Sequence, residues 1–270
     1  YGGADYNGGI ATWIQSTSKT TQITIRFTNC KFINVSNCAI GENALNPKFK
    51  IQGGAFHHGY TNTLNNACLI FSLCEFSSNS ALGCGGGLAF EVNGDIDIID
   101  CIFNSNKAKI STIYPECLSN GGALFFSDNI TSKEPKSVTI KYCTFIDNEG
   151  TKGSSIYYHD DASSNTKLII ESCTFQNNGK VGQSQIWSYT KSFNFFNNTL
   201  GYNSTSQIDD TGEDFAISLP TADLIDISYC GFYNQQESVC HGGGFLYINQ
   251  ASTSLVYDQT FNLNHLVFDG

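Results

Sequence analysis

Apolar and polar residues follow one pattern that returns along the whole chain. Its clearest copy runs from Val138 to Asn148 and reads apolar, any, apolar, any, any, Cys, any, Phe, any, any, Asn. Apolar residues that alternate with polar ones predict a short strand with one buried face. The alternation shifts before the cysteine, which predicts a bend and a second short strand. A glycine pair followed by apolar residues, as in 121–126, adds a third strand.

Copies of this pattern recur at unequal intervals, and no stretch of the chain has a convincing helical period. A fixed pattern at variable spacing is typical of repeat proteins that carry loop insertions. In two copies Phe193 and Gln259 take the place of the cysteine. The eight copies are identified by the phenylalanines Phe32, Phe76, Phe103, Phe145, Phe175, Phe195, Phe232 and Phe261. The six cysteines at the shared position are Cys30, Cys74, Cys101, Cys143, Cys173 and Cys230.

These repeats predict an all-β fold, a single-stranded parallel β-helix or solenoid of about eight coils with loop insertions. We expect residues 1–270 to form one domain that is part of a longer chain or of a filament. Equivalent side chains would stack about 4.8 Å apart. The phenylalanines would then form an internal column of rings, with the small cysteines packed beside it. Asparagines at the bend would form a hydrogen-bonded ladder.

Two halves of the repeat together resemble the repeat of polymorphic outer membrane proteins, which are chlamydial autotransporter adhesins. The first half is Phe-x-x-Asn, as in Phe103–Asn106 and Phe145–Asn148, and the second is Gly-Gly-Ala-Leu at Gly121–Leu124. The resemblance covers nearly the whole chain, although Val35 and Gln235 replace two of the asparagines. It implies a right-handed β-helix that serves in surface adhesion or as a stalk, with no shared catalytic residues.

Composition bears on location and partners. The formal net charge is −10 and Arg26 is the sole arginine, so the basic stripe of a nucleic-acid binder is absent. No apolar run is as long as a bilayer-spanning helix. Eleven cysteines and four Asn-x-Ser/Thr sequons favour an extracellular or cell-surface location. The candidate glycosylation sites are Asn34, Asn129, Asn197 and Asn203.

The cysteines outside the shared position include one candidate disulfide. Cys84 and Cys117 both precede a glycine pair, in neighbouring repeats, so we expect them to pair. Because the number of cysteines is odd, at least one is unpaired or pairs with another chain. The column cysteines are interpreted either as disulfide partners or as thiols that act as small hydrophobic side chains.

Parallel β-helices also include enzymes that cleave acidic polysaccharides, so we compared the chain with their requirements. Such enzymes use a carboxylate cluster for Ca²⁺ and a basic residue. The aspartate pairs at 160–161 and 209–210 lie in polar insertions, and Asp95 and Asp97 alternate with apolar residues on an outer face. No histidine or cysteine spacing indicates a zinc site. We therefore expect no catalytic residue, metal or cofactor.

The function that we expect is that of a non-enzymatic, extracellular structural or adhesive β-helix glycoprotein, as a subunit of a surface fibre or filament. Its expected partners are other copies of itself or further repeats stacked end to end, together with glycans or surface receptors of a host. The alternative is a polysaccharide-binding or pectate-lyase-like β-helix. In that case outward aromatic side chains such as Tyr157 and Trp187 would stack on sugars.

Overall fold

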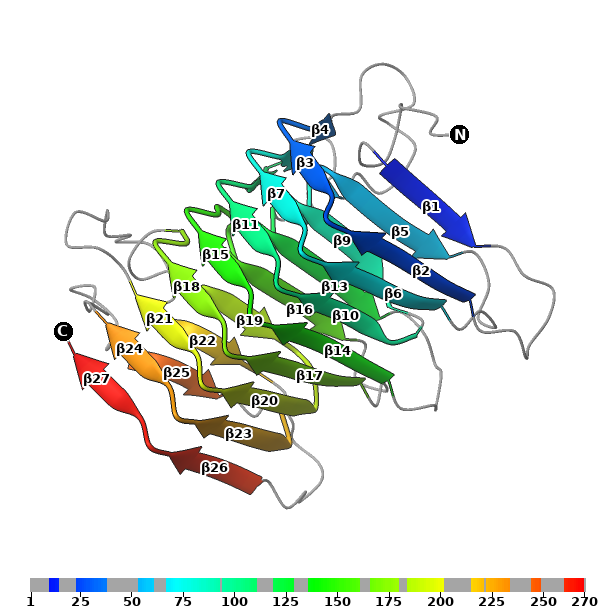
Figure 1. Ribbon diagram of the computed structural model, residues 1–270. Coiled ribbons are helices and arrows are strands. Elements are labelled where there is room, and N and C mark those ends of the chain that lie inside the picture. The colour runs from blue at the N-terminus through cyan, green and yellow to red at the C-terminus, as the bar shows by residue number, and fades with distance from the viewer. Residues whose placement is uncertain are drawn as a thin grey trace.

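The computed structural model describes thirteen segments of the chain, and within them it contains strands and no helix. Nearly all strands belong to three long sheets, here called A, B and C, and a short sheet D lies beside sheet C (Figure 1). The described segments are 10–14, 23–37, 53–60, 67–92, 94–110, 119–128, 136–160, 166–179, 184–201, 215–220, 222–233, 244–248 and 260–269.

Each long sheet has eight strands, and every pairing between neighbours is parallel. Sheet A consists of β1 (Ile10–Ile14), β5 (Phe56–Tyr60), β9 (Leu88–Glu91), β13 (Leu124–Asp128), β16 (Ile156–Asp160), β19 (Ile186–Ser188), β22 (Phe215–Leu219) and β25 (Gly244–Ile248). Sheet B consists of β2 (Ile23–Thr28), β6 (Ala67–Ser72), β10 (Ile96–Ile99), β14 (Lys136–Lys141), β17 (Thr166–Glu171), β20 (Ser192–Phe196), β23 (Leu224–Ser228) and β26 (Thr260–Asn264).

Sheets C and D follow the bends after sheet B. Sheet C consists of β3 (Lys31–Ile33), β7 (Glu75–Ser77), β11 (Ile102–Asn104), β15 (Thr144–Ile146), β18 (Thr174–Gln176), β21 (Thr199–Gly201), β24 (Gly231–Tyr233) and β27 (Val267–Asp269). Sheet D consists of β4 (Ser36–Asn37), β8 (Ser80–Leu82) and β12 (Lys107–Lys109).

Successive strands visit the sheets in a fixed order. For example, β9, β10 and β11 lie in sheets A, B and C, and β13, β14 and β15 lie beside them in the same order. Figure 1 shows these layers stacked along one axis. The predicted all-β chain of stacked parallel strands is therefore confirmed, and the arrangement is solenoid-like.

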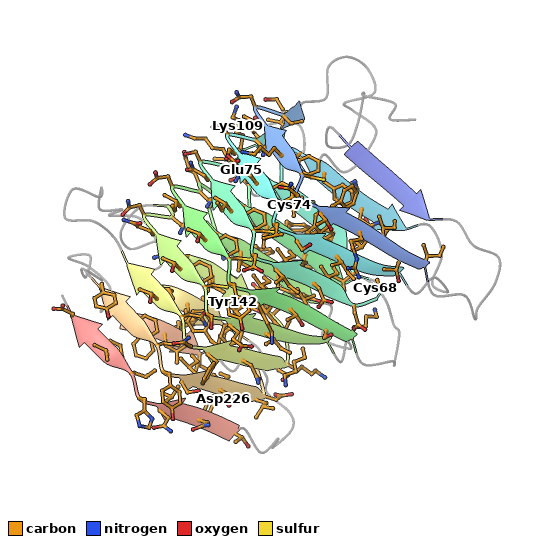
Figure 2. All side chains as sticks on the ribbon, viewed as in Figure 1. Cys68, Cys74, Glu75, Lys109, Tyr142 and Asp226 are labelled. Carbon is orange, nitrogen blue, oxygen red and sulfur yellow. The ribbon has the colours of Figure 1, made fainter. Side chains whose placement is uncertain are left out.

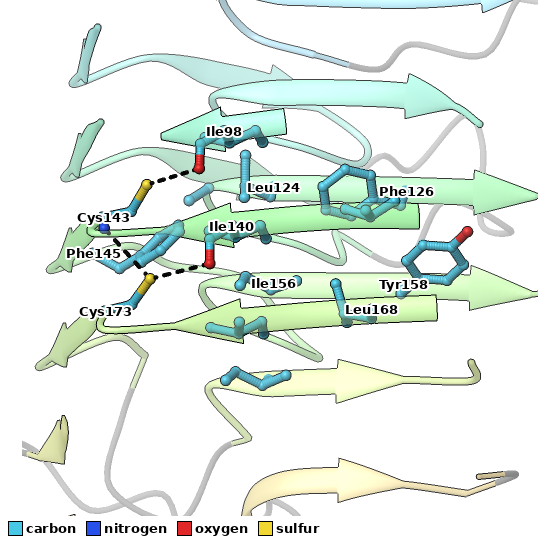
Figure 3. Packing of buried hydrophobic residues seen from close by; sticks show 14 of the residues in the cluster. Ile98, Leu124, Phe126, Ile140, Cys143, Phe145, Ile156, Tyr158, Leu168 and Cys173 are labelled. Atoms are coloured by element: carbon cyan, nitrogen blue, oxygen red, sulfur yellow. Dashed lines mark hydrogen bonds between the residues drawn. The ribbon is translucent and has the colours of Figure 1, made fainter. Parts of the chain in front are cut away.

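The core lies between the three long sheets and follows from the alternation of residue types. In β14 the buried residues are Lys136, Val138 and Ile140, and the residues between them are partly exposed. Val138 pairs with Ile96 on one side and with Leu168 on the other, so equivalent apolar side chains stack from layer to layer. The close-up shows this packing around Ile140 and Phe145 (Figure 3). Inward residues of sheets A, B and C form one continuous cluster.

The glycine pairs lie at a sharp bend before sheet A. Gly121 has a φ of 67°, which lies in the left-handed region that glycine adopts without strain. A Cβ atom on Gly122 would lie 2.1 Å from the carbonyl oxygen of Ser154 in the next layer. The first glycine is therefore needed for its backbone conformation, and the second for the close approach between layers.

The predicted register is wrong for two phenylalanines. Phe195 pairs with Ile170 in sheet B, and Phe261 pairs with Ile225 in the same sheet. Neither residue therefore belongs to the phenylalanine column of sheet C. The Phe-x-x-Asn pattern predicted that Phe195 lies in sheet C. In the structure Phe193 and Phe195 instead occupy the alternating inward positions of the preceding strand, which belongs to sheet B. Their sheet C counterparts are Leu200 and Phe268.

Candidate functional sites

The phenylalanine column runs through the inward positions of sheet C. Neighbouring layers are in register, and the rings of Phe103 and Phe145 are nearly parallel with centroids 4.9 Å apart. Phe145 and Phe175 are 4.7 Å apart and inclined by only 2°. Stacked rings at this spacing bury most of their apolar surface. The column positions, in layer order, hold Phe32, Phe76, Phe103, Phe145, Phe175, Leu200, Phe232 and Phe268.

A second column of buried aromatic rings lies in sheet A and was not predicted. Phe90 stacks on Phe126 with centroids 5.3 Å apart, and Phe126 stacks on Tyr158 at 5.6 Å. The sequence signal was the residue four positions after the second glycine of each pair, which is aromatic at Phe90 and Phe126. The core thus contains two aromatic columns, one in sheet C and one in sheet A.

The cysteine column lies at the bend between sheets B and C, where its thiols hydrogen-bond to backbone groups. The Sγ atom of Cys143 donates to the carbonyl oxygens of Lys141 at 3.1 Å and of Ile98, one layer away, at 3.4 Å. The same sulfur accepts the backbone N–H of Cys101 at 3.4 Å. Burial raises the pKa of Cys143, so it remains a neutral thiol. Figure 3 shows the equivalent bonds of Cys143 and Cys173.

The column cysteines are not joined by disulfides. None of Cys30, Cys74, Cys101, Cys143, Cys173 and Cys230 is bridged. The structure therefore fits the second interpretation of these residues, as small thiols in an apolar column. Cys84 lies buried on the outer side of sheet A, and its expected partner Cys117 lies outside the described residues.

The asparagine ladder lies at the next bend, between sheets C and D. Asn148 Nδ2 donates to Asn178 Oδ1 at 2.8 Å and to the carbonyl oxygen of Phe103 at 2.9 Å. Its own Oδ1 accepts the N–H and the Nδ2 of Asn106, each at 3.0 Å. The four members, Asn79, Asn106, Asn148 and Asn178, are fully buried. Each amide therefore joins its layer to the two neighbouring layers.

An aromatic cluster covers part of the outer face of sheet A. Phe125 stacks on Tyr157, and Trp187 follows in the next layer, with Nζ of Lys152 4.1 Å from the centre of its ring. Only 7 % of Tyr157 and 4 % of Trp187 is exposed. Burial raises the pKa of Tyr157, and nearby Tyr189 adds to the shift. The expectation that these two rings stack on sugars is wrong, because other side chains cover them.

Several polar side chains lie close together on the outer face of sheet B. Asp95 Oδ1 accepts the backbone N–H of Ser137 at 2.9 Å and its hydroxyl at 3.0 Å. Burial raises the pKa of Asp97, and the charge of Asp95 adds to the shift. Burial and these two carboxylates also raise the pKa of Cys68, so its thiol is not activated as a nucleophile. The structure brings Cys68 beside the aspartates, which the sequence did not indicate.

Only two of the four sequons fall in the described segments. Asn34 and Asn197 are both exposed and both have a positive φ, 57° and 53°. Asn129, Asn203 and the aspartates at 209–210 lie outside those segments. Among the residues that are described, no three His, Cys, Asp or Glu side chains gather closely enough to hold a metal ion. The same residues include no helix of the length and apolar character that crossing a bilayer requires.

The layer formed by β26 and β27 exposes large apolar side chains. In sheet B Leu263 continues the column of Ile227, and in sheet C Phe268 stacks on Phe232 with centroids 5.4 Å apart. About half of Phe261, Leu263, Val267 and Phe268 is exposed, between 45 % and 56 %. These side chains therefore form an apolar surface at one end of the stack, here called the β26–β27 surface.

Comparison of the chain with protein-family models, with curated proteins and with solved structures finds no match to any of them.

Proposed function

We propose that this chain is a right-handed, single-stranded parallel β-helix of about eight coils. It serves as an extracellular structural or adhesive glycoprotein, either as a stiff element at a cell surface or as a subunit of a fibre. Its repeat is of the kind found in polymorphic outer membrane proteins. The observation that supports this proposal is the asparagine ladder, because the recurring residues of the repeat bond one layer to the next rather than converge on a pocket.

Such a molecule is built to be long and stiff. Asn106 and Asn148 link consecutive layers through buried hydrogen bonds, and Phe103 and Phe145 stack in the same layers. Buried amide ladders and stacked rings resist sliding of one layer over another. Eight coils at the parallel-strand spacing span about 38 Å. The outer faces then remain available for glycans and for other molecules.

The β26–β27 surface supports assembly along the axis. An unpaired parallel edge with exposed apolar side chains favours the addition of a further layer. That layer would come from further repeats of the same kind or from another copy of the chain. Either partner would continue the apolar columns at Leu263 and Phe268.

Assembly is tested by light scattering and negative-stain electron microscopy of the purified chain over a range of concentrations. We expect rods that lengthen with concentration, and we expect Leu263→Lys with Phe268→Lys to stop the lengthening. Ile102→Lys is the matched control, because Ile102 is 47 % exposed but lies in the middle of the stack. Monomers at every concentration, or equal effects of both substitutions, would rule out the fibre.

Location is tested separately on the native cells. Antibodies against the chain should label intact cells, and external protease should remove the signal. Labelling that appears only after permeabilisation would contradict a surface role. Adhesion is then measured as the binding of purified chain to cells and to glycan arrays, with chain denatured by heat as the control.

A further inference from the structure

The sequon at Asn197 lies in an exposed bend between sheets B and C. Asn197 and Thr199, the first and third residues of the sequon, are exposed, and Asn198 between them is buried. Equivalent positions of this bend carry a positive φ in successive layers, at Tyr142, Ser172, Asn197 and Tyr229. The side chain of Asn197 therefore projects from a regular corner of the stack. Figure 2 shows this corner at Tyr142.

Two exposed aromatic rings flank this asparagine. Phe196 precedes it and is 42 % exposed, and Tyr229 occupies the same corner one layer away and is 52 % exposed. The two rings contact each other edge to face, with centroids 5.4 Å apart. On its other side Tyr229 stacks on His265 at 4.5 Å. No other part of the described corner combines a sequon with touching exposed rings.

We propose that Asn197 carries an N-linked oligosaccharide whose first sugar packs on Phe196 and Tyr229. In the attachment step Nδ2 of Asn197 attacks the anomeric carbon of an oligosaccharide carried on a lipid pyrophosphate. The bond from that carbon to the pyrophosphate oxygen breaks, the lipid pyrophosphate leaves, and Nδ2 loses one proton. The occupant of this aromatic patch is thus a glycan of the chain itself.

The geometry of the corner suits this arrangement. Tyr229 lies one layer from Asn197, about 4.8 Å along the axis, which is within reach of the first sugar ring. Nδ2 of Asn197 donates to Ser172 Oγ at 3.0 Å. A glycosylated amide keeps one N–H, so this bond can persist and orient the side chain. The C–H face of a sugar is apolar and packs favourably against aromatic surface. Because His265 covers one face of Tyr229, the sugar would pack on the surface that Phe196 and Tyr229 leave exposed.

Asn34 supplies a comparison within the same chain. It is also an exposed sequon asparagine at a bend with positive φ. The equivalent positions in the following layers are Ser78, Ser105, Asp147 and Asn177, none of which is aromatic. A glycan at Asn34 would therefore find no ring at its own corner, and the packing proposed for Asn197 should be specific to that site.

The test uses the chain secreted from a eukaryotic host that attaches high-mannose glycans. Peptide mass mapping should find Asn197 occupied, and an endoglycosidase then trims each glycan to a single sugar. The single sugar at Asn197 should raise Tm by about 2–4 °C relative to Asn197→Gln. The rise should disappear when Phe196→Ser and Tyr229→Ser are combined. Serine is tolerated there, because Ser172 and Ser228 occupy the equivalent positions.

Two controls make the result decisive. Tyr142→Ser removes a ring of similar exposure at the same corner two layers away, and it should leave the rise in Tm intact. Asn34→Gln should change Tm little. An unoccupied Asn197, or a rise that survives loss of both flanking rings, would overturn the inference. The inference rests on the proposed extracellular location. Because the expression host supplies the transferase, the Tm test can fail while antibodies still label native cells, so the two failures are distinguishable.

Discussion

Oδ1 of Asn198 accepts the backbone N–H of Cys173 at 2.8 Å, so an amide occupies a position that is a thiol in most other layers. In the neighbouring layer the Sγ atom of Cys173 accepts the N–H of Cys143. Nδ2 of Asn198 donates to the carbonyl oxygen of Ile170, which matches the bond from Cys173 to Ile140. The bend therefore requires a small side chain that both donates and accepts.

The first prediction follows from this substitution. Asn198→Ala should destabilise the fold by about 1–3 kcal/mol, because it removes the side-chain acceptor of the buried Cys173 N–H and the side-chain donor to the Ile170 carbonyl. Asn198→Cys should cost less, since a thiol makes both bonds elsewhere. Urea unfolding followed by far-UV circular dichroism measures both, with the exposed Thr199→Ala as the control. Equal losses for alanine and cysteine would show that a thiol does not replace the two hydrogen bonds of Asn198 and would contradict this prediction.

The second prediction concerns the asparagine ladder. Asn148→Leu should lower the free energy of unfolding by about 3 kcal/mol or more, because four buried hydrogen bonds are lost at once. This loss should exceed that of Asn198→Ala. The measurement is again the free energy of unfolding in urea, supported by hydrogen exchange of the Asn106 N–H. Asn104→Ala is the control, since Asn104 is only partly buried and bonds to adjacent Ser105. If the ladder contributed nothing to stability, Asn148→Leu and Asn104→Ala would lower the free energy of unfolding by similar amounts.

Local patterns in the sequence predicted most of the fold. Alternation identified the strands of sheet B, and the glycine pairs marked the bends before sheet A. The repeat also placed the buried ladder of Asn106 and Asn148 at its bend. These features depend on residues close in sequence, so a single chain was sufficient to predict them.

The misplaced phenylalanines show where local pattern is ambiguous. Phe195-Phe-Asn-Asn198 matches the Phe-x-x-Asn half of the repeat, but its asparagine occupies the cysteine position. Leu200 holds the ring position of that layer. Two frames fitted the local residues, and only pairing with the neighbouring layers distinguishes them. Burial of Trp187 was missed for a related reason, since alternation predicts an outward direction but not the side chains that cover it.

The third prediction tests the close approach of layers at the glycine pairs. Gly122→Ala should cost more than about 3 kcal/mol or prevent folding, because its Cβ would lie 2.1 Å from the Ser154 oxygen and 2.7 Å from backbone atoms of Glu149. Gly201→Ala is the matched control, since its Cβ would lie 3.2 Å from the nearest atom. Comparable yields and Tm values for the two variants would mean that the layers separate easily.

The last prediction concerns alkaline pH. Burial raises the pKa of Cys74 and of Cys230 to about 11, from an ordinary value of 9.0. Between these values the unfolded chain loses thiol protons that the folded chain keeps, so the unfolded state binds fewer protons and stability falls as pH rises. Above about 11 the folded thiols ionise as well, and their contribution to the slope ends. Tm measured from pH 8 to 11 should therefore decline more steeply for the parent chain than for Cys74→Ser with Cys230→Ser. Serine keeps a donor and an acceptor at each bend but does not titrate in this range, and parallel curves would show that these thiols ionise equally in both states.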